Sequence, residues 1–360
     1  MSAPSKWLFS PGIDLGVFLG SAVLSLVALA IGSRTSVLHG ETPGWAWVPS
    51  VVLVDVAHVW ATGFRVYLDP EERARRPWLY TMVPAICLSC GLALHRVGEA
   101  VFWRALAYVA IVHFVRQQAG WVQLYRARAK DEGALGRFVD LAAIYAATLY
   151  PLLYWHTHLP RAFSWFVPGD VVALPLVVER VARPLWVLAL AAYAVRSVIA
   201  HVTRRGASFG KDVVVVTTAI CWWVGMVGYD SDYAFTVTNV FIHGVPYVAL
   251  VWIYGRRVER ARVRIFAYGP WLLLAAIWAL AYGEELVWDR AVWHDHPWLF
   301  GEGWQLDALR PLIVPVLATV QLTHYVLDGF IWRRRKNPQL AGALALALTP
   351  SAARRTDPAP

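Results

Sequence analysis

Four histidines lie within hydrophobic stretches of this chain, and each has a polar partner three or four residues away. The pairs are Asp55 with His58, His113 with Gln117, Asn239 with His243, and His324 with Asp328. This spacing places both members of a pair on one face of a helix. Imidazole and carboxylate groups together suit iron, zinc, manganese or copper. The pattern therefore predicts a metal site built from four helices.

The surroundings of these pairs make a shared role more plausible than four separate ones. An ionisable group within a bilayer is unfavourable, by roughly 2.5–3.5 kcal/mol for an Asp at a helix centre on insertion scales. One such histidine on its own is best interpreted as a hydrogen-bonded core residue. Four histidines, each with a partner on the same face, favour a common buried site.

The composition is that of a polytopic membrane protein. Of the 360 residues, 58% are hydrophobic and only 16% are charged, which excludes an ordinary soluble domain. We predict an all-α, polytopic bundle of about ten transmembrane helices, each long enough for a bilayer core of ~30 Å. The expected spans are 12–32, 46–64, 78–96, 100–122, 138–156, 183–202, 212–229, 232–254, 263–283 and 310–332. Residues 1–336 would form this domain, and residues 337–360 a cytoplasmic, partly disordered tail.

Lys and Arg residues gather at the N-terminus, after every second span and at the C-terminus. The positive-inside rule then predicts that both termini are cytoplasmic, in a bacterial inner membrane. Membrane orientation also explains the net charge of +9, and no nucleic-acid motif is visible. The loops 157–182 and 284–309 would face outward, and the acidic, Trp-rich second loop, with Glu284 and Glu285, would lie at the outer interface.

The four histidines are expected at similar depth. Each precedes the basic residue at the cytosolic end of its span by 7 to 13 residues, which corresponds to roughly 10–20 Å along a helix. The imidazoles can thus occupy one layer in the inner half of the membrane. Asp55 and Asp328 bracket this layer, and Gln117 falls within it.

The ligand set leaves the number of metal ions open. A single ion would be bound by the histidines, with the acids orienting their ring N–H groups, whereas in a two-metal site Asp55 or Asp328 would bridge. Nitrogen and oxygen ligands without a nearby cysteine favour non-haem iron over a structural zinc. The candidate ligands are His58, His113, His243, His324, Asp328 and Asp55.

Four residues near this layer are candidates for catalysis: Asp55, Arg116, Gln117 and Tyr325. Because a cation next to a metal ion is unfavourable, Arg116 is expected to pair with Asp55, Asp328 or a substrate carboxylate. It could equally extend its side chain to lipid phosphates.

The segments around the histidines resemble those of histidine-rich polytopic membrane proteins of the non-haem iron oxygenase class, with bacterial β-carotene dioxygenases as one possible relative. The segments are Asp55-Val-Ala-His58, His113-Phe-Val-Arg-Gln-Gln118, Asn239-Val-Phe-Ile-His243-Gly-Val-Pro and Thr323-His324-Tyr-Val-Leu-Asp328-Gly. The dense H-x-x-x-H and H-x-x-H-H boxes of membrane desaturases and hydroxylases do not occur in this sequence. The resemblance implies one or two iron ions, O₂ and a lipid-soluble substrate.

Three functions fit these observations. The first, which we favour, is a metal-dependent oxygenase or oxidase whose lipid-soluble substrate enters sideways past an aromatic wall that includes Trp60, Phe114, Tyr247 and Tyr325. A ferredoxin-type electron donor would dock on the basic cytosolic face. The second is a proton-coupled transporter that uses the same buried residues, and the third is a b-type haem protein with paired axial histidines. The basic face consists of Arg256, Arg257, Arg260, Arg262, Arg264 and Arg333 to Lys336.

Overall fold

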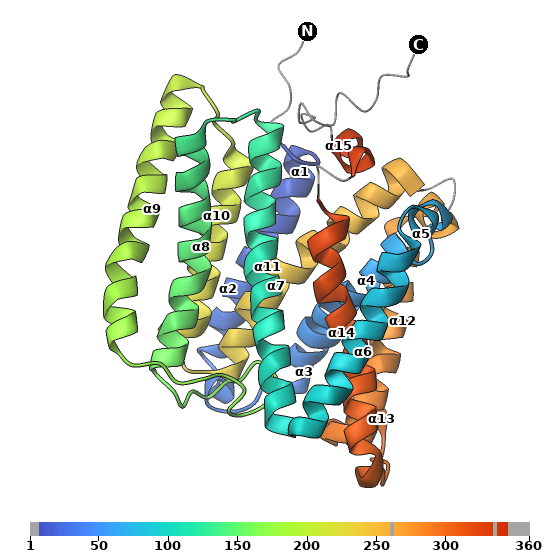
Figure 1. Cartoon of the computed structure of the whole chain (residues 1–360). Helices are drawn as coiled ribbons and strands as arrows, with labels where there is room; N and C mark the ends of the chain where they lie inside the picture. The colour runs from blue at the N-terminus through green and yellow to red at the C-terminus, as the bar shows by residue number, and fades with distance from the viewer. Residues whose placement is uncertain (1–6, 260–262, 334–336, 345–360) are drawn as a thin grey trace.

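The computed structural model describes residues 7–259, 263–333 and 337–344, and in these ranges the chain forms helices and no strands. Nine segments of this part of the chain are long and apolar enough to cross a membrane. The predicted all-α polytopic membrane bundle is thereby confirmed (Figure 1).

Six of the nine spans lie in the first two thirds of the chain. They are α1 (Pro11–Asp14) with η1 (Leu15–Leu19) and α2 (Gly20–Gly32); α3 (Gly44–Trp47) with η3 (Val48–Val56) and α4 (Ala57–Val66); α6 (Pro77–Val97); α8 (Ala134–Thr157); α9 (Val177–Thr203); and α10 (Phe209–Trp223) with η4 (Val224–Gly228). The other three are α11 (Asp232–Tyr254) with η5 (Gly255–Glu259); α12 (Pro270–Trp288) with η7 (Asp289–Trp293); and η8 (Asp307–Leu309) with α14 (Arg310–Ile331). The short elements are η2 (Ser36–His39), α5 (Pro70–Arg75), η6 (Arg264–Ala267), α13 (Pro297–Phe300) and α15 (Pro338–Ala343).

The remaining predicted span, 100–122, corresponds to α7 (Glu99–Arg128), whose 30 residues make it the longest helix of the described chain. It is less apolar than the nine others because it carries Arg104, Arg116 and neighbouring glutamines. It nevertheless packs between α6, α8, α10 and α14 and lies in the middle of the bundle in Figure 1. Gln118 is therefore buried in the interior, whereas Arg104 and Arg116 lie on the exposed side of the helix.

The first and last described helices lie at the same end of the bundle. Figure 1 shows α1, α5 and α15 at this end, which we call the terminal end, and α3 and α13 at the opposite, loop end. The first residues of the predicted tail are not separate from the bundle, because Leu340, Ala341 and Leu344 are buried in its core. Residues 345–360 lie outside the described residues.

The ninth span begins later than the sequence analysis predicted. The structure places its start at Pro270, because proline fits the first turn of a helix and not its interior. The helical segment then continues to Trp293. Glu284 and Glu285, which were expected in an outer loop, consequently lie within α12 and are buried.

The terminal ends of α7 to α10 are joined by buried ion pairs. Asp140, which is fully buried, accepts hydrogen bonds from Arg126 at 2.5 Å, Arg196 at 2.6 Å and Lys211 at 2.8 Å. Asp131 adds a second carboxylate that pairs with both arginines. Each buried charge therefore has a partner from another helix or loop.

We predict that Asp140→Asn lowers the free energy of unfolding by about 3 kcal/mol or more, because it leaves buried cations without their main counter-charge. The exposed Glu132 in the preceding loop provides the matched control, and Glu132→Gln should change stability by less than about 0.5 kcal/mol. Thermal unfolding of both variants in detergent measures the difference. Equal melting temperatures would contradict this role of Asp140.

Candidate metal centre

The four histidines come from four helices and meet in the interior of the bundle. His58 lies on α4, His113 on α7, His243 on α11 and His324 on α14, and their exposed fractions are 1%, 6%, 0% and 1%. Ring centroids of neighbouring members lie 4.6 to 6.4 Å apart. The structure thus brings together the four residues that the sequence analysis singled out, and we call them the histidine cluster.

The Nε2 atoms of the histidine cluster point inward. Those of His58 and His243 are 3.1 Å apart, and those of His113 and His324 are 3.2 Å apart. Two nitrogen ligands at ~2.0–2.1 Å from one metal ion would be separated by roughly 2.8–3.4 Å in octahedral or tetrahedral geometry. The observed separations therefore fit pairs of ligands on a common ion.

The Nδ1 atoms of His58, His113 and His324 point outward, toward carboxylates and a hydroxyl, whereas Nδ1 of His243 has no hydrogen-bond partner among the described residues. Asp55 Oδ1 lies 3.6 Å from Nδ1 of His58. The two oxygens of Asp328 lie 3.9 Å from Nδ1 of His324 and 4.0 Å from Nδ1 of His113. Groups in this position orient metal-binding imidazoles and fix their tautomer. Both aspartates are thus placed around the Nε2 atoms and not between them.

A hydrogen-bond chain determines the protonation of His324. Tyr247 donates its hydroxyl proton to Asp328 Oδ1 at 2.6 Å, so the hydroxyl of Thr62, 2.6 Å from the Tyr247 oxygen, donates to that oxygen. The Thr62 oxygen then accepts the proton of His324 Nδ1 at 2.7 Å. Nε2 of His324 consequently keeps its lone pair and is free to bind a metal.

Thr62 was not predicted as a site residue from the sequence, and Tyr247 was predicted only as part of an aromatic wall. Both residues carried a usable signal. Thr62 follows His58 by four residues, and Tyr247 follows His243 by four residues. This spacing places each on the same helix face as its histidine, one turn further along.

His243 is held by its helix and by a neighbouring ring. The ring of Phe114 stacks on the imidazole with centroids 3.5 Å apart and an angle of 6°. Gln117, expected among the catalytic residues, instead donates from Nε2 to the backbone carbonyl of His243 at 2.8 Å. Gln117 is thereby a positioning residue that ties α7 to α11. Asn239, the predicted partner of His243, donates to the carbonyl of Phe235 one turn earlier in α11.

Of the expected partners of Arg116, Asp55 and Asp328 are not in contact with it, and its exposed position agrees with the alternative of extension to lipid phosphates. Its side chain is exposed on α7 while His113 and Phe114 on the same helix are buried, and no described residue pairs with it, including Asp55 and Asp328. Tyr325, in contrast, lies beside the histidine cluster, with its ring centroid 4.9 Å from that of His113.

Within the described residues, two groups of three could hold a metal ion, with candidate ligand atoms within 4.8 Å of one another. One comprises His58, His113 and His243, and the other comprises His113, His324 and Asp328. The first is purely imidazole, and the second has the two-histidine, one-carboxylate composition of many non-haem iron sites. Because His113 belongs to both, one-metal and two-metal arrangements share the same core.

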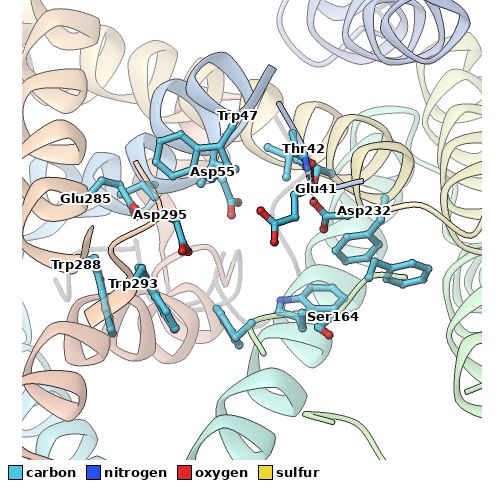
Figure 2. A pocket seen from close by; sticks show the side chains of 18 of the residues that line it. Glu41, Thr42, Trp47, Asp55, Ser164, Asp232, Glu285, Trp288, Trp293 and Asp295 are labelled. Atoms are coloured by element: carbon cyan, nitrogen blue, oxygen red, sulfur yellow. Dashed lines mark hydrogen bonds between the residues drawn. The ribbon is translucent and has the colours of Figure 1, made fainter. Parts of the chain in front are cut away.

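A cavity of about 440 Å³ extends from the loop end to residues that contact the histidine cluster, and Figure 2 shows part of its lining. Asp55, Phe114, Asn239 and Tyr325 form its wall next to the cluster, and the loop residues around Glu41 and Asp295 line it further out. We call it the acidic cavity, because its lining in the described chain has six carboxylates and no Lys or Arg. It gives a molecule of small-ligand size access to the residues that contact the imidazoles.

No protein-family model, curated protein or solved structure matches this chain. The fold and the site therefore define the class of protein directly: a helical integral membrane protein with a buried histidine cluster able to hold a metal ion. A function must be argued from the chemistry of this site, because a helical bundle alone implies none.

The close approach of α11 to η3 at Gly244, next to His243, provides a test of this packing. A Cβ atom there would lie 2.6 Å from Cγ1 of Val54 and 3.0 Å from its carbonyl oxygen. We predict that Gly244→Ala pushes the two segments apart and lowers the free energy of unfolding by about 1–3 kcal/mol.

Gly63 on α4 is the matched control, since a Cβ atom there would have no neighbour within 4 Å. Gly63→Ala should preserve or slightly raise stability, because alanine is the better helix former. Melting temperatures of the two variants decide the point, and a Gly244→Ala variant as stable as Gly63→Ala would disprove the close contact.

Proposed function

We propose that this protein is an integral membrane metalloenzyme that binds one non-haem iron ion through the Nε2 atoms of His58, His113, His243 and His324. The reaction would be the O₂-dependent oxidation of a lipid-soluble substrate. One observation carries the proposal: Nε2 atoms converge at 3.1 and 3.2 Å within a fully buried cluster. Aspartates and a threonine on the Nδ1 side supply the supporting contacts that such ligands need.

Iron is favoured over a structural zinc by the donor set. Structural zinc sites are commonly rich in thiolates, whereas Cys87, Cys90 and Cys221 belong to neither of the possible metal groups in the described chain. Imidazole combined with nearby carboxylate is the environment of non-haem iron centres that activate O₂. Iron bound here would supply that activation.

The protein residues would bind substrate, exclude water and move protons. Phe114 and Tyr325 separate the imidazoles from the acidic cavity, and their bulk limits how much water would reach a metal ion bound by the histidine cluster. The Asp55 carboxylate, 35% exposed and 3.6 Å from His58 Nδ1, borders the cavity and the cluster at once. It is placed to accept or return a proton during the reaction.

The acidic cavity supports substrate entry from the loop end. The sequence predicted entry sideways from lipid, past Trp60, Phe114, Tyr247 and Tyr325. Tyr247, however, is 1% exposed and fixed by hydrogen bonds to Thr62 and Asp328, and the half-buried Trp60 donates from Nε1 to Glu284 at 2.7 Å. Because Phe114 and Tyr325 of the same wall line the acidic cavity, we assign entry to the cavity.

The same proposal includes a cytoplasmic terminal end in a bacterial inner membrane and a ferredoxin-type donor there. Arg256 donates to the carbonyl groups of Phe266 and Ala267, and Arg257 to that of Ala343. These two arginines therefore already hold the chain in place at this end. Five further residues of the predicted docking face lie outside the described residues: Arg260, Arg262, Arg334, Arg335 and Lys336.

The haem alternative is disfavoured by the Nε2 geometry. Two axial imidazoles lie on opposite sides of a porphyrin, with the iron and the macrocycle between their Nε2 atoms. His58 and His243 approach to 3.1 Å and His113 and His324 to 3.2 Å, which leaves no space for a macrocycle between the members of either pair.

We predict that His113→Ala removes the bound metal, because His113 belongs to both possible ligand groups. His95 is the matched control, since it is also buried on a membrane helix, at 9% exposure, but lies outside both groups. His95→Ala should keep about one iron per chain by mass spectrometry, and substrate-dependent O₂ uptake should be lost only in His113→Ala. Equal metal content in both variants would refute the site, and a wild-type protein without metal would favour a proton-coupled carrier.

We further predict that Thr62→Val, which removes the hydroxyl bound to His324 but preserves the shape, weakens iron binding roughly 10–100-fold. Thr217→Val is the control, because the Thr217 hydroxyl bonds only to carbonyl groups of its own helix. Metal affinity can be measured by chelator competition. Indistinguishable affinities would show that the hydroxyl does not support the site.

A further inference from the structure

We propose that the acidic cavity binds an organic cation, either a protonated amine or a quaternary ammonium group. As a claim about substrate class it rests on the proposed function, because the cavity leads to the histidine cluster. As a claim about binding it stands on the cavity itself. The six carboxylates of its described lining are Glu41, Asp55, Asp232, Glu285, Asp289 and Asp295.

Two of these carboxylates serve the protein's own structure. Asp232 accepts hydrogen bonds from the backbone and hydroxyl of Thr42, and Asp289 accepts from the backbone of Asp295 and His296. Asp55 lies near His58. The carboxylates of the remaining three have no hydrogen bond or ion pair with any described residue. Figure 2 shows carboxylates of Glu41, Asp55 and Asp295 directed into the same space.

Two buried groups in the wall require a partner that the protein does not supply. Glu285 is only 7% exposed, lines the cavity and has no hydrogen-bond or ion-pair partner among the described residues. Asn239 is 2% exposed, lines the same cavity, and its Oδ1 atom has no hydrogen-bond partner in the described chain. A buried carboxylate and a buried carbonyl without partners are costly. The Asn239 Oδ1 atom is itself enclosed, so Glu285 is the unpaired group that borders the cavity. A cation in the cavity would supply the partner that an ionised Glu285 carboxylate lacks.

The rest of the wall favours an organic cation over a bare metal ion. Tryptophan faces attract ammonium groups, and acidic aromatic cages are a common way to bind quaternary ammonium. The rings of Trp288 and Trp293 are stacked with centroids 5.6 Å apart, and Trp103 adds a third ring 5.3 Å from Trp293. No group of three or more cavity carboxylates in the described chain is close enough to share a metal ion. The cavity is also larger than an ion requires, at about 440 Å³.

The position of these groups suggests how such a ligand would lie. The stacked tryptophans and Asp295 are toward the loop end, whereas Phe114 and Tyr325 are against the imidazoles. A cationic group held beside Trp293 and Asp295 would leave the remainder of the molecule directed toward the histidine cluster. The substrate class is then an amphiphile with one amine or ammonium end.

The experiment is calorimetric titration of the full chain in a non-ionic detergent, with choline and with its uncharged isostere 3,3-dimethylbutan-1-ol. Choline should bind at least roughly tenfold more tightly than the alcohol. Glu285→Gln should weaken choline binding roughly tenfold while metal content stays at the wild-type level. Asp295→Asn, at an exposed position that does not threaten folding, should weaken it in the same direction.

Glu302→Gln is the matched control, because Glu302 is exposed in the same loop region and does not line the cavity. Equal affinity for choline and the alcohol would overturn the proposal, as would wild-type choline affinity in both Glu285→Gln and Asp295→Asn. Mn²⁺ binding that is tighter than choline binding and is lost in Glu285→Gln would replace it with an inorganic cation site.

The two proposals fail separately in this experiment. Titrations are made on the protein as purified and after chelator treatment. Choline binding in a protein that never holds metal would preserve the cavity assignment and reject the metalloenzyme. A metal-containing protein that does not bind choline would preserve the metalloenzyme and reject the cavity assignment.

Discussion

The burial of four imidazoles in a membrane interior is the constraint on which the rest of this structure depends. A buried ring nitrogen without a partner is unfavourable there, because the surroundings offer little water. Nδ1 of His324 is bonded to Thr62, whereas Nδ1 of His243 has no hydrogen-bond partner among the described residues. The Nε2 atoms of the histidine cluster face one another, and a metal ion that takes their lone pairs would satisfy all four at once.

This constraint explains several features that would otherwise be unfavourable. α7 keeps two glutamines in its interior-facing region because Gln117 and Gln118 donate to consecutive carbonyl groups of α11, at His243 and Ile242. α11 is buried along most of its length, and Gly244 lets it approach η3 without a side chain between them. The two glutamates of α12 are likewise kept from lipid, because Glu285 lines the acidic cavity and Glu284 accepts a hydrogen bond from Trp60.

The sequence was sufficient for the parts of the account that follow from periodicity and hydrophobicity. Ten helices and the pairing of His58 with Asp55 on one face follow from spacing alone. Sequence could not show that α4, α7, α11 and α14 are neighbours, because adjacency of membrane helices is decided by packing between distant segments. The start of α12 was misplaced because apolar residues precede Pro270, and this error hid the role of Glu285. The sequence left two positions open for Arg116, because a turn shared with His113 does not fix which neighbour a long side chain meets, and its exposed side chain agrees with extension toward lipid phosphates.

X-ray absorption at the metal edge of the purified protein tests the central claim most directly. The account predicts an iron edge and a first shell of nitrogen and oxygen at roughly 2.0–2.2 Å, with the outer-shell pattern of several imidazoles. A first shell that contains sulfur would contradict it, because the cysteines of the described chain lie outside the histidine cluster. So would a protein that carries no metal after growth in iron-replete medium, since the Nε2 atoms of His58, His113, His243 and His324 would then serve another purpose.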